Sequence, residues 1–375
     1  MGNQSADLPL SPTPVIIHQS VKHQKAALAA FFLMKKNLLI IAALLLASVA
    51  LIVVLLRSAG PDRVIAHFNR TYNRFTLQAL DTVAFPGRIS IMKVNNGVVY
   101  GYVYKNTAIY SYDVSHRRLD TFFNNSKASI NLMCGFDIDT PACYLFDASG
   151  ARVIAYQPAT GAIDSIKCGS KCYIRATRAA TGNAFITQGF DPEKQRANLR
   201  LAGLSNAHKD STIYEFTHFE DGGLSADGFF TKNTHTGDLY YIPFYNSEII
   251  HYNQPAKQIS KLITIDKTPP ANIAVPSGKI YTLSGKAIFV NSAAAADDQY
   301  LYVLSYALSE DAQASGYHGP SLDIYNIATG NYESSIRLPG YENLPVLQLA
   351  KYNDTLVAAY DKNVLLFRLT TAANL

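Results

Sequence analysis

The chain has 375 residues, of which 48% are apolar, with 24 Tyr, 18 Phe and no Trp. This composition supplies enough apolar area for a sizeable packed core, so it excludes a largely disordered chain. The net charge of +5 lies mostly in the first 60 residues, and the rest of the chain is nearly neutral. Because no basic surface of the kind that binds phosphate backbones remains, we expect no nucleic-acid partner.

An uncharged apolar run without Pro or Gly extends from Leu38 to Leu56. Its 19 residues, at a helical rise of ~1.5 Å each, cover a hydrocarbon layer of roughly 30 Å. Lys35 and Lys36 precede the run, which favours a cytoplasmic N-terminus and a C-terminal portion that is periplasmic or extracellular. The predicted segments are a cytoplasmic tail over residues 1–36, a single transmembrane helix over residues 37–57 and a linker over residues 58–75.

A cleaved signal peptide is the alternative interpretation of this run. Met34 with Lys35 and Lys36 resembles a second start site with a basic leader, and Ser48, Val49 and Ala50 resemble a cleavage site. The apolar run continues past that site through LIVVLL and is longer than the apolar part of a usual signal peptide. We therefore favour a retained membrane anchor.

One β-hairpin pattern recurs after the anchor: an aromatic-rich strand, a short polar turn, and an aliphatic strand that ends near an aromatic residue. The copies occupy residues 98–113, 142–157, 184–204, 238–253, 300–330 and 354–369, and the fifth is split by an insertion. Equivalent positions on the second strands are Tyr112, Tyr156, Leu201, Tyr252, Tyr325 and Phe367. Four of the five steps between these positions are 42–51 residues long, which is the spacing of one propeller blade per repeat.

Further strand candidates flank the hairpins, such as residues 88–94 and 344–350, so each repeat has the four strands of a propeller blade. The last repeat lacks an outer strand, whereas the strand-like residues 76–85 precede the first repeat. We expect this N-terminal strand to complete the last blade and leave no open sheet edge. The sequence therefore predicts an all-β fold, a six-bladed β-propeller over residues 76–370 with a tail over residues 371–375. A β-sandwich is the alternative.

The repeats resemble those of bacterial six-bladed β-propellers in the broad group that includes NHL-like and TolB-like proteins. The recurring hairpins and two matching turns, QPATGAIDSI and NIATGNYESSI, carry the resemblance. It covers residues 76–369 and implies an architecture rather than a single activity. The weak repeat at 184–204 and the inserted residues 264–286 depart from the regular pattern.

Four cysteines form two close pairs, Cys134 with Cys143 and Cys168 with Cys172. Outside the cytoplasm, an even number of closely paired cysteines favours disulfides, and adjacent strands can place Cys134 opposite Cys143. A zinc site of four thiolates is the alternative, although the spacings do not fit those of typical zinc sites. We expect disulfides and no metal.

Local motifs for catalysis are missing from the sequence. The nine His residues include no metal-binding pair, and no nucleophile elbow or phosphate-binding loop is present. We therefore expect no cofactor and name no catalytic residue. The insertion at residues 310–321 lengthens one hairpin turn, and Tyr317 and His318 are its candidate binding residues.

The predicted function is that of a non-enzymatic binding or scaffolding propeller, held at the membrane by one helix, that binds a protein, peptide or glycan of the cell envelope. The alternative is a hydrolase or lyase with its active site in the central channel. Such a site draws its side chains from several blades and has no local spacing in the sequence. The two hypotheses are separated by the channel: an enzyme should bring carboxylates or His from three or more blades together, whereas an apolar and Tyr-filled channel would reject it.

Overall fold

The computed structural model of the chain describes residues 34–54, 67–124, 128–130, 133–139, 141–167, 173–180, 184–191, 193–203, 211–233, 235–278, 280–285 and 287–371. The chain divides into two units, Met1–Asp62 and Arg63–Leu375. In the first unit, Met34–Val54 form one helix of 21 residues, with none of its apolar stretch buried. Its length and composition are those of a membrane anchor or a signal sequence.

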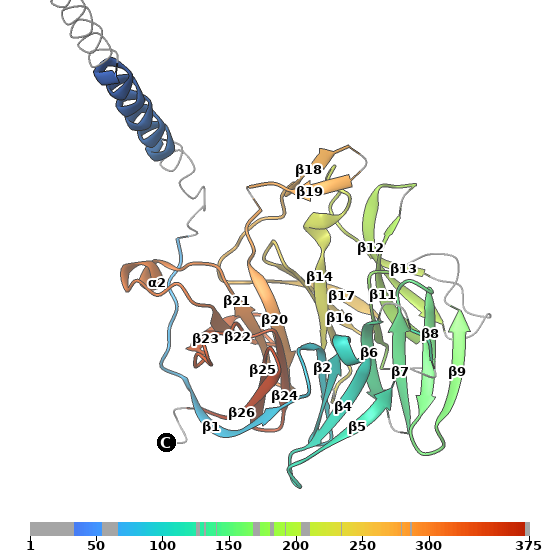
Figure 1. Cartoon of the computed structure of the whole chain (residues 1–375). Helices are drawn as coiled ribbons and strands as arrows, with labels where there is room; N and C mark the ends of the chain where they lie inside the picture. The colour runs from blue at the N-terminus through green and yellow to red at the C-terminus, as the bar shows by residue number, and fades with distance from the viewer. Residues whose placement is uncertain are drawn as a thin grey trace, which may run out of the picture. The chain divides into compact units, whose positions relative to one another are not determined.

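The second unit is a six-bladed β-propeller, as Figure 1 shows. Blade 1 consists of β2 (Ile89–Asn95), β3 (Val98–Val103), β4 (Ala108–Asp113) and β5 (Arg118–Asn124). Blade 2 consists of β6 (Met133–Asp139), β7 (Ala142–Asp147), β8 (Arg152–Gln157) and β9 (Ala162–Lys167). Blade 3 consists of β10 (Arg175–Arg178), β11 (Ala184–Asp191), β12 (Arg196–Gly203) and β13 (Ser211–Glu215).

The remaining three blades repeat this four-stranded antiparallel arrangement. Blade 4 consists of β14 (Gly228–Lys232), β15 (Leu239–Pro243), β16 (Glu248–Asn253) and β17 (Gln258–Ile263). Blade 5 consists of β20 (Asn291–Ala296), β21 (Tyr300–Ser305), β22 (Ser321–Asn326) and β23 (Tyr332–Arg337). Blade 6 consists of β24 (Gln348–Tyr352), β25 (Thr355–Tyr360), β26 (Asn363–Thr371) and β1 (Phe75–Ala84).

The first strand of each blade faces the centre of the ring. These innermost strands contact one another in the order β2, β6, β10, β14, β20 and β24, and β24 contacts β2 again. The ring is therefore closed around a central channel. The six innermost strands line this channel and run parallel to one another. This closure excludes the β-sandwich alternative.

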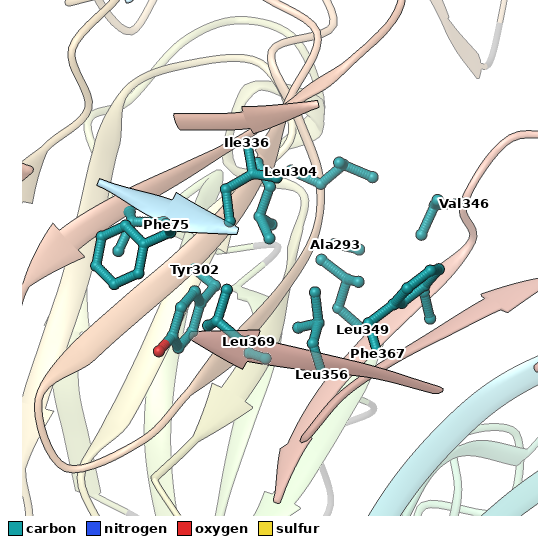
Figure 2. Close-up of a cluster of buried hydrophobic side chains, with 14 of the residues drawn as sticks. Phe75, Ala293, Tyr302, Leu304, Ile336, Val346, Leu349, Leu356, Phe367 and Leu369 are labelled. Atoms are coloured by element: carbon teal, nitrogen blue, oxygen red, sulfur yellow. The ribbon is translucent and has the colours of Figure 1, made fainter. Parts of the chain in front are cut away.

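Apolar side chains pack between blades, because a twisted sheet buries its two faces only against its neighbours. Figure 2 shows the cluster between blades 5 and 6, in which Phe75 of β1 lies near Tyr302 of β21 and Leu369 of β26. Phe75 also meets Tyr300 edge to face, with 5.3 Å between the ring centroids. Similar clusters join each of the other neighbouring pairs of blades.

The N-terminal strand closes the ring as the sequence predicts. β1 pairs antiparallel with β26, with Phe75 opposite Thr371 and Ala84 opposite Asn363. The six positions aligned from the repeats all lie on the third strands of the six blades, so the blade count is confirmed. The weak repeat at residues 184–204 is also a regular hairpin, β11 paired with β12.

The insertion between blades 4 and 5 contains a separate two-stranded sheet, β18 (Ala274–Ser277) and β19 (Ile280–Leu283). This hairpin projects away from the four-stranded sheets (Figure 1). Its exposed apolar side chains are Val275, Ile280, Tyr281 and Leu283. The shorter insertion between β21 and β22 forms a one-turn helix, α2 (Glu310–Ala314).

Candidate functional site

A cavity of about 550 Å³ lies at the C-terminal ends of the six innermost strands. Because these strands run in the same direction, their ends meet at the same mouth of the channel. Every blade contributes to the lining, with Lys93, Asp137, Arg178, Lys232, Ala296 and Lys351 coming from blades 1 to 6 in turn. The lining is thus polar and charged, with basic residues from four blades.

Asp137 is the most buried acid of the cavity, with 4% of the residue exposed. Its carboxylate accepts hydrogen bonds from the Thr177 hydroxyl at 2.8 Å and the Arg178 backbone N–H at 2.5 Å. The Lys93 ammonium lies 3.4 Å away. Burial alone would raise the pKa of Asp137, but the charges of Lys93 and Lys232 and the two hydrogen bonds outweigh burial and lower that pKa.

Arg178 is held in place by two contacts. Its Nη1 lies 2.7 Å from Oδ2 of Asp139, and its guanidinium lies over the Tyr144 ring at 4.1 Å from the centroid. The side chain is only 16% exposed. A planar guanidinium fixed in this way is preorganised for an acidic group in the cavity.

Lys351 lies beside the cavity at the end of β24, with 4% of its side chain exposed. Its ammonium is 3.7 Å from Oδ2 of Asp297, which also accepts a hydrogen bond from the Tyr302 hydroxyl at 2.7 Å. Burial lowers the pKa of Lys351, although Asp297 opposes this effect. Asp297 itself does not line the cavity.

Lys232, at the end of β14, differs from the other three cations. Among the described residues, no carboxylate lies within ion-pair distance of its ammonium, and its charge acts on Asp137 at longer range. His235 lies in the turn after β14, is exposed and also lines the cavity. Asn95 and Asn96 add neutral polar groups at the end of β2.

The channel matches neither of the two outcomes expected from the sequence. Its carboxylates, Asp137 and Asp139, both come from blade 2, and His235 comes from blade 4, so the acids and His span two blades. The cavity is not filled by apolar and Tyr side chains either. Within the described ranges, no group of three or more His, Cys, Asp or Glu residues is arranged to hold a metal ion.

Tyr317 and His318 lie away from the cavity. They follow α2 between β21 and β22, at one end of blade 5. Ala296, which lines the cavity, lies at the other end of the same blade. The Tyr317 hydroxyl donates to the Pro320 carbonyl at 2.9 Å, whereas His318 is exposed. Their binding role stays a prediction that is separate from the cavity.

The expected bond between Cys134 and Cys143 is not formed, and both thiols are free. Cys143 lies opposite Ile138, whereas Cys134 lies at a register shift beside Gly135, at the far end of the same strand pair. Cys134 is four residues from Ile138 on β6, so roughly 13 Å along the strand separates Cys134 from the position of Cys143. This separation is well beyond the ~7 Å between Cα atoms that a disulfide spans. Cys168 and Cys172 lie outside the described residues.

Comparisons with known proteins find the fold and no family. No protein-family model matches the sequence, and no curated protein matches it. A solved structure of a DUF4221 family member from Bacteroides vulgatus is similar, with 12% identity, a TM-score of 0.54, and coverage of 80% of this chain and 99% of that one. The Cps50 (Swd1) β-propeller domain of Myceliophteria thermophila has 10% identity and a TM-score of 0.45, over 79% of this chain and 100% of that one.

The similarity to the DUF4221 family member shows the architecture alone. Together with the ring of six sheets, it defines the class of protein: a six-bladed β-propeller preceded in sequence by an apolar helix of membrane-spanning length. The narrower NHL-like or TolB-like group is not identified by the comparisons.

Proposed function

We propose that the chain is a membrane-anchored, non-enzymatic binding module that acts outside the cytoplasm, and that its ligand site is the central cavity. The observation that carries the proposal is that all six blades contribute to one polar cavity of about 550 Å³. Closure of the ring supports Lys93, Asp137, Lys232 and Lys351 of the lining on strands packed side by side. This volume suits a small polar ligand, or one end of a glycan or peptide, of the cell envelope.

The N-terminal helix supports attachment to the membrane. Lys35 and Lys36 at its beginning favour a cytoplasmic N-terminus, which places the propeller on the other side. A tether of this kind keeps the binding site near the membrane surface and raises its local concentration there.

The contacts of the acidic residues favour binding over catalysis. Asp137 already accepts two hydrogen bonds and faces Lys93, and its lowered pKa keeps it ionised near neutral pH, where it is a poor general acid. Asp139 is paired with Arg178. A hydrolase or lyase needs groups free to exchange protons with a substrate.

Filling the cavity tests the proposal. Thr236 is exposed, lines the cavity, and accepts a hydrogen bond from the Asp238 N–H at 3.2 Å. Thr329 is its matched control: it is exposed, does not line the cavity, and accepts the same kind of bond from the Asn331 N–H at 3.3 Å. The full chain in lipid nanodiscs would be applied to defined glycan and peptide arrays.

We expect wild type and Thr329→Trp to bind the same array members and Thr236→Trp to lose them. Ligands retained equally by Thr236→Trp would show that the cavity is not the site. Consumption of a bound ligand that is abolished by Asp137→Asn would support the hydrolase or lyase alternative instead.

The compartment is tested separately by trypsin added to intact cells. A propeller outside the cytoplasm is reached by the protease after the outer permeability barrier is opened, whereas a cytoplasmic one is protected until the inner membrane is lysed. Protection before lysis would contradict the proposed orientation.

A further inference from the structure

We infer that the central cavity selects an anionic ligand, one that carries a carboxylate or phosphate group, and that Lys232 is its main charge partner. This inference rests on the proposed function, because it concerns the chemistry recognised by the same cavity.

The charge balance of the cavity supports an anion. Four cationic side chains from four blades line it, against two carboxylates from one blade; the cations are Lys93, Arg178, Lys232 and Lys351. Lys93 lies 3.4 Å from Asp137, and Arg178 lies 2.7 Å from Asp139. Both carboxylates of the lining are therefore already matched by a neighbouring cation.

Of the other two cations, Lys351 is already paired: its ammonium lies 3.7 Å from Oδ2 of Asp297, which is outside the lining, and it also donates to the Asn353 carbonyl. Lys232 has no carboxylate within ion-pair distance among the described residues and is half-buried. A half-buried ammonium without a direct counterion gains a charge-assisted hydrogen bond when an anion enters. The low-dielectric walls of the channel strengthen this attraction relative to an exposed lysine.

The geometry also limits the size and polarity of the ligand. The volume of about 550 Å³ accommodates a small molecule, and Asn95 and Asn96 offer amide groups to hydroxyls or carbonyls beside the charged end. Arg178, fixed by Tyr144 and Asp139, faces the same space with little rotational freedom to lose. A small polar acid, such as a sugar acid or a sugar phosphate, fits these features.

Calorimetric titration of the full chain in nanodiscs of zwitterionic lipid tests the inference with three probes: glucuronate, glucose 6-phosphate and glucose. We expect at least one acid to bind about tenfold or more tightly than glucose, and its affinity to fall as salt rises. Comparison of the two acids distinguishes a carboxylate ligand from a phosphate ligand.

The decisive variant is Lys232→Gln, which should weaken binding of the preferred acid by about tenfold or more. Lys261→Gln is the control, because Lys261 is on β17 of the same blade, is paired with Glu248 at 2.7 Å and lies outside the cavity. The control should bind like wild type. Both variants should unfold at the wild-type temperature.

Three results would overturn the inference. Equal affinity for glucose and both acids, or an unchanged affinity of Lys232→Gln for the acids, would show that charge does not select the ligand. Absence of binding by both acids at millimolar concentration would have the same meaning. In each case the cavity-binding proposal is still decided by Thr236→Trp. Failure of the charge-selection inference and failure of the proposed function are therefore distinguishable.

Discussion

Arg70 and Asp323 form a buried ion pair that joins the segment before β1 to blade 5. Arg70 Nε donates to Oδ1 of Asp323 at 2.7 Å, and Nη2 donates to Oδ2 at 3.0 Å. The two side chains are 2% and 0% exposed. Arg70 also donates to the Ala307 carbonyl at 2.9 Å, and Ser335 donates to Asp323 at 2.6 Å. The described residues 67–74, which precede β1, are thereby an integral part of the propeller.

Breaking this pair should strongly destabilise the fold. We expect Arg70→Met to lower the free energy of unfolding by about 3–5 kcal/mol, because Asp323 is left as a buried charge without its partner. The double variant with Asp323→Leu should recover much of this loss. Arg88→Met is the control, since its side chain is 69% exposed and 4.0 Å from Asp361. Urea unfolding followed by Tyr fluorescence measures all three, and equal stability of Arg70→Met and Arg88→Met would contradict the prediction.

The aromatic contact of β1 with blade 5 should contribute to ring closure. Phe75→Ala removes a ring that is 5% exposed and packs on Tyr300, so we expect a loss of about 3–5 kcal/mol. Leu80→Ala in the same strand, at 37% exposure, should cost much less. Size-exclusion chromatography should also detect self-association of Phe75→Ala through the weakened edge. Similar unfolding of both variants would show that closure does not depend on this contact.

Gly135 allows the innermost strands of blades 2 and 3 to approach closely. A Cβ atom at this position would lie 2.7 Å from the backbone carbonyl oxygen of Ala176. Because that oxygen belongs to the backbone, Gly135→Ala should destabilise the protein by about 1–3 kcal/mol. Gly340→Ala meets no atom within 4 Å and should change stability by less than ~1 kcal/mol. Thermal unfolding of the two variants checks this difference.

His251 should make stability depend on pH. Its ring stacks on Tyr240 at 4.7 Å, and Nε2 lies 3.7 Å from Asp238, but burial lowers its pKa below the ordinary value of 6.5. Below about pH 6.5 the unfolded chain therefore takes up a proton more readily than the native one, and stability falls as the pH drops towards the native pKa.

His251→Gln should remove this part of the pH dependence. Urea unfolding at about pH 7.5 and 5.5, on either side of the ordinary His pKa, measures it. His318→Gln, an exposed position, should retain the wild-type dependence. If His251→Gln and wild type lose the same stability on acidification, His251 is not the responsible group.

The free thiols give a test of both structure and compartment. Burial raises the pKa of Cys134 to about 12 and also raises that of Cys143, which is 0% exposed. Neither should react with iodoacetamide in the native protein at mildly alkaline pH, and both should react after unfolding. Peptide mapping without reduction should yield no Cys134–Cys143 link; finding one would contradict the strand register.

Separately, free thiols at Cys168 and Cys172 in intact cells would argue against an extracytoplasmic propeller.

The ring was predictable because its information is local and repeated. Each blade carries its own hairpin pattern, and the missing outer strand at the end of the chain matched the extra strand at the beginning. The separation of Cys134 from Cys143 was not predictable, because it depends on where the hairpin turns: Asp139 pairs with Ala142, which puts Ile138 rather than Cys134 opposite Cys143.

The cavity was not predictable from local motifs, because its residues meet only when the ring closes. Successive members of the set Lys93, Arg178, Lys232 and Lys351 are 85, 54 and 119 residues apart. The feature of the sequence that could have revealed the cavity is their common position near the end of the first strand of a blade. Lys93 falls within the strand expected at residues 88–94, and Lys351 directly follows the one expected at residues 344–350. Alignment of the first strands, rather than of the hairpins, would have brought these lysines together.

The pairing of Phe75 with Thr371 also means that the ring can close only after β26 has been synthesised. Among the described strands, β1 leaves the ribosome first, whereas its sheet partner β26 (Asn363–Thr371) leaves last. The first strand therefore stays unpaired while five blades are made. The ring closes when this strand pairs with β26, far away in the sequence. A closing step between such distant segments is slow, so the unpaired edges of the nascent chain stay open to pairing with other chains until β26 is complete.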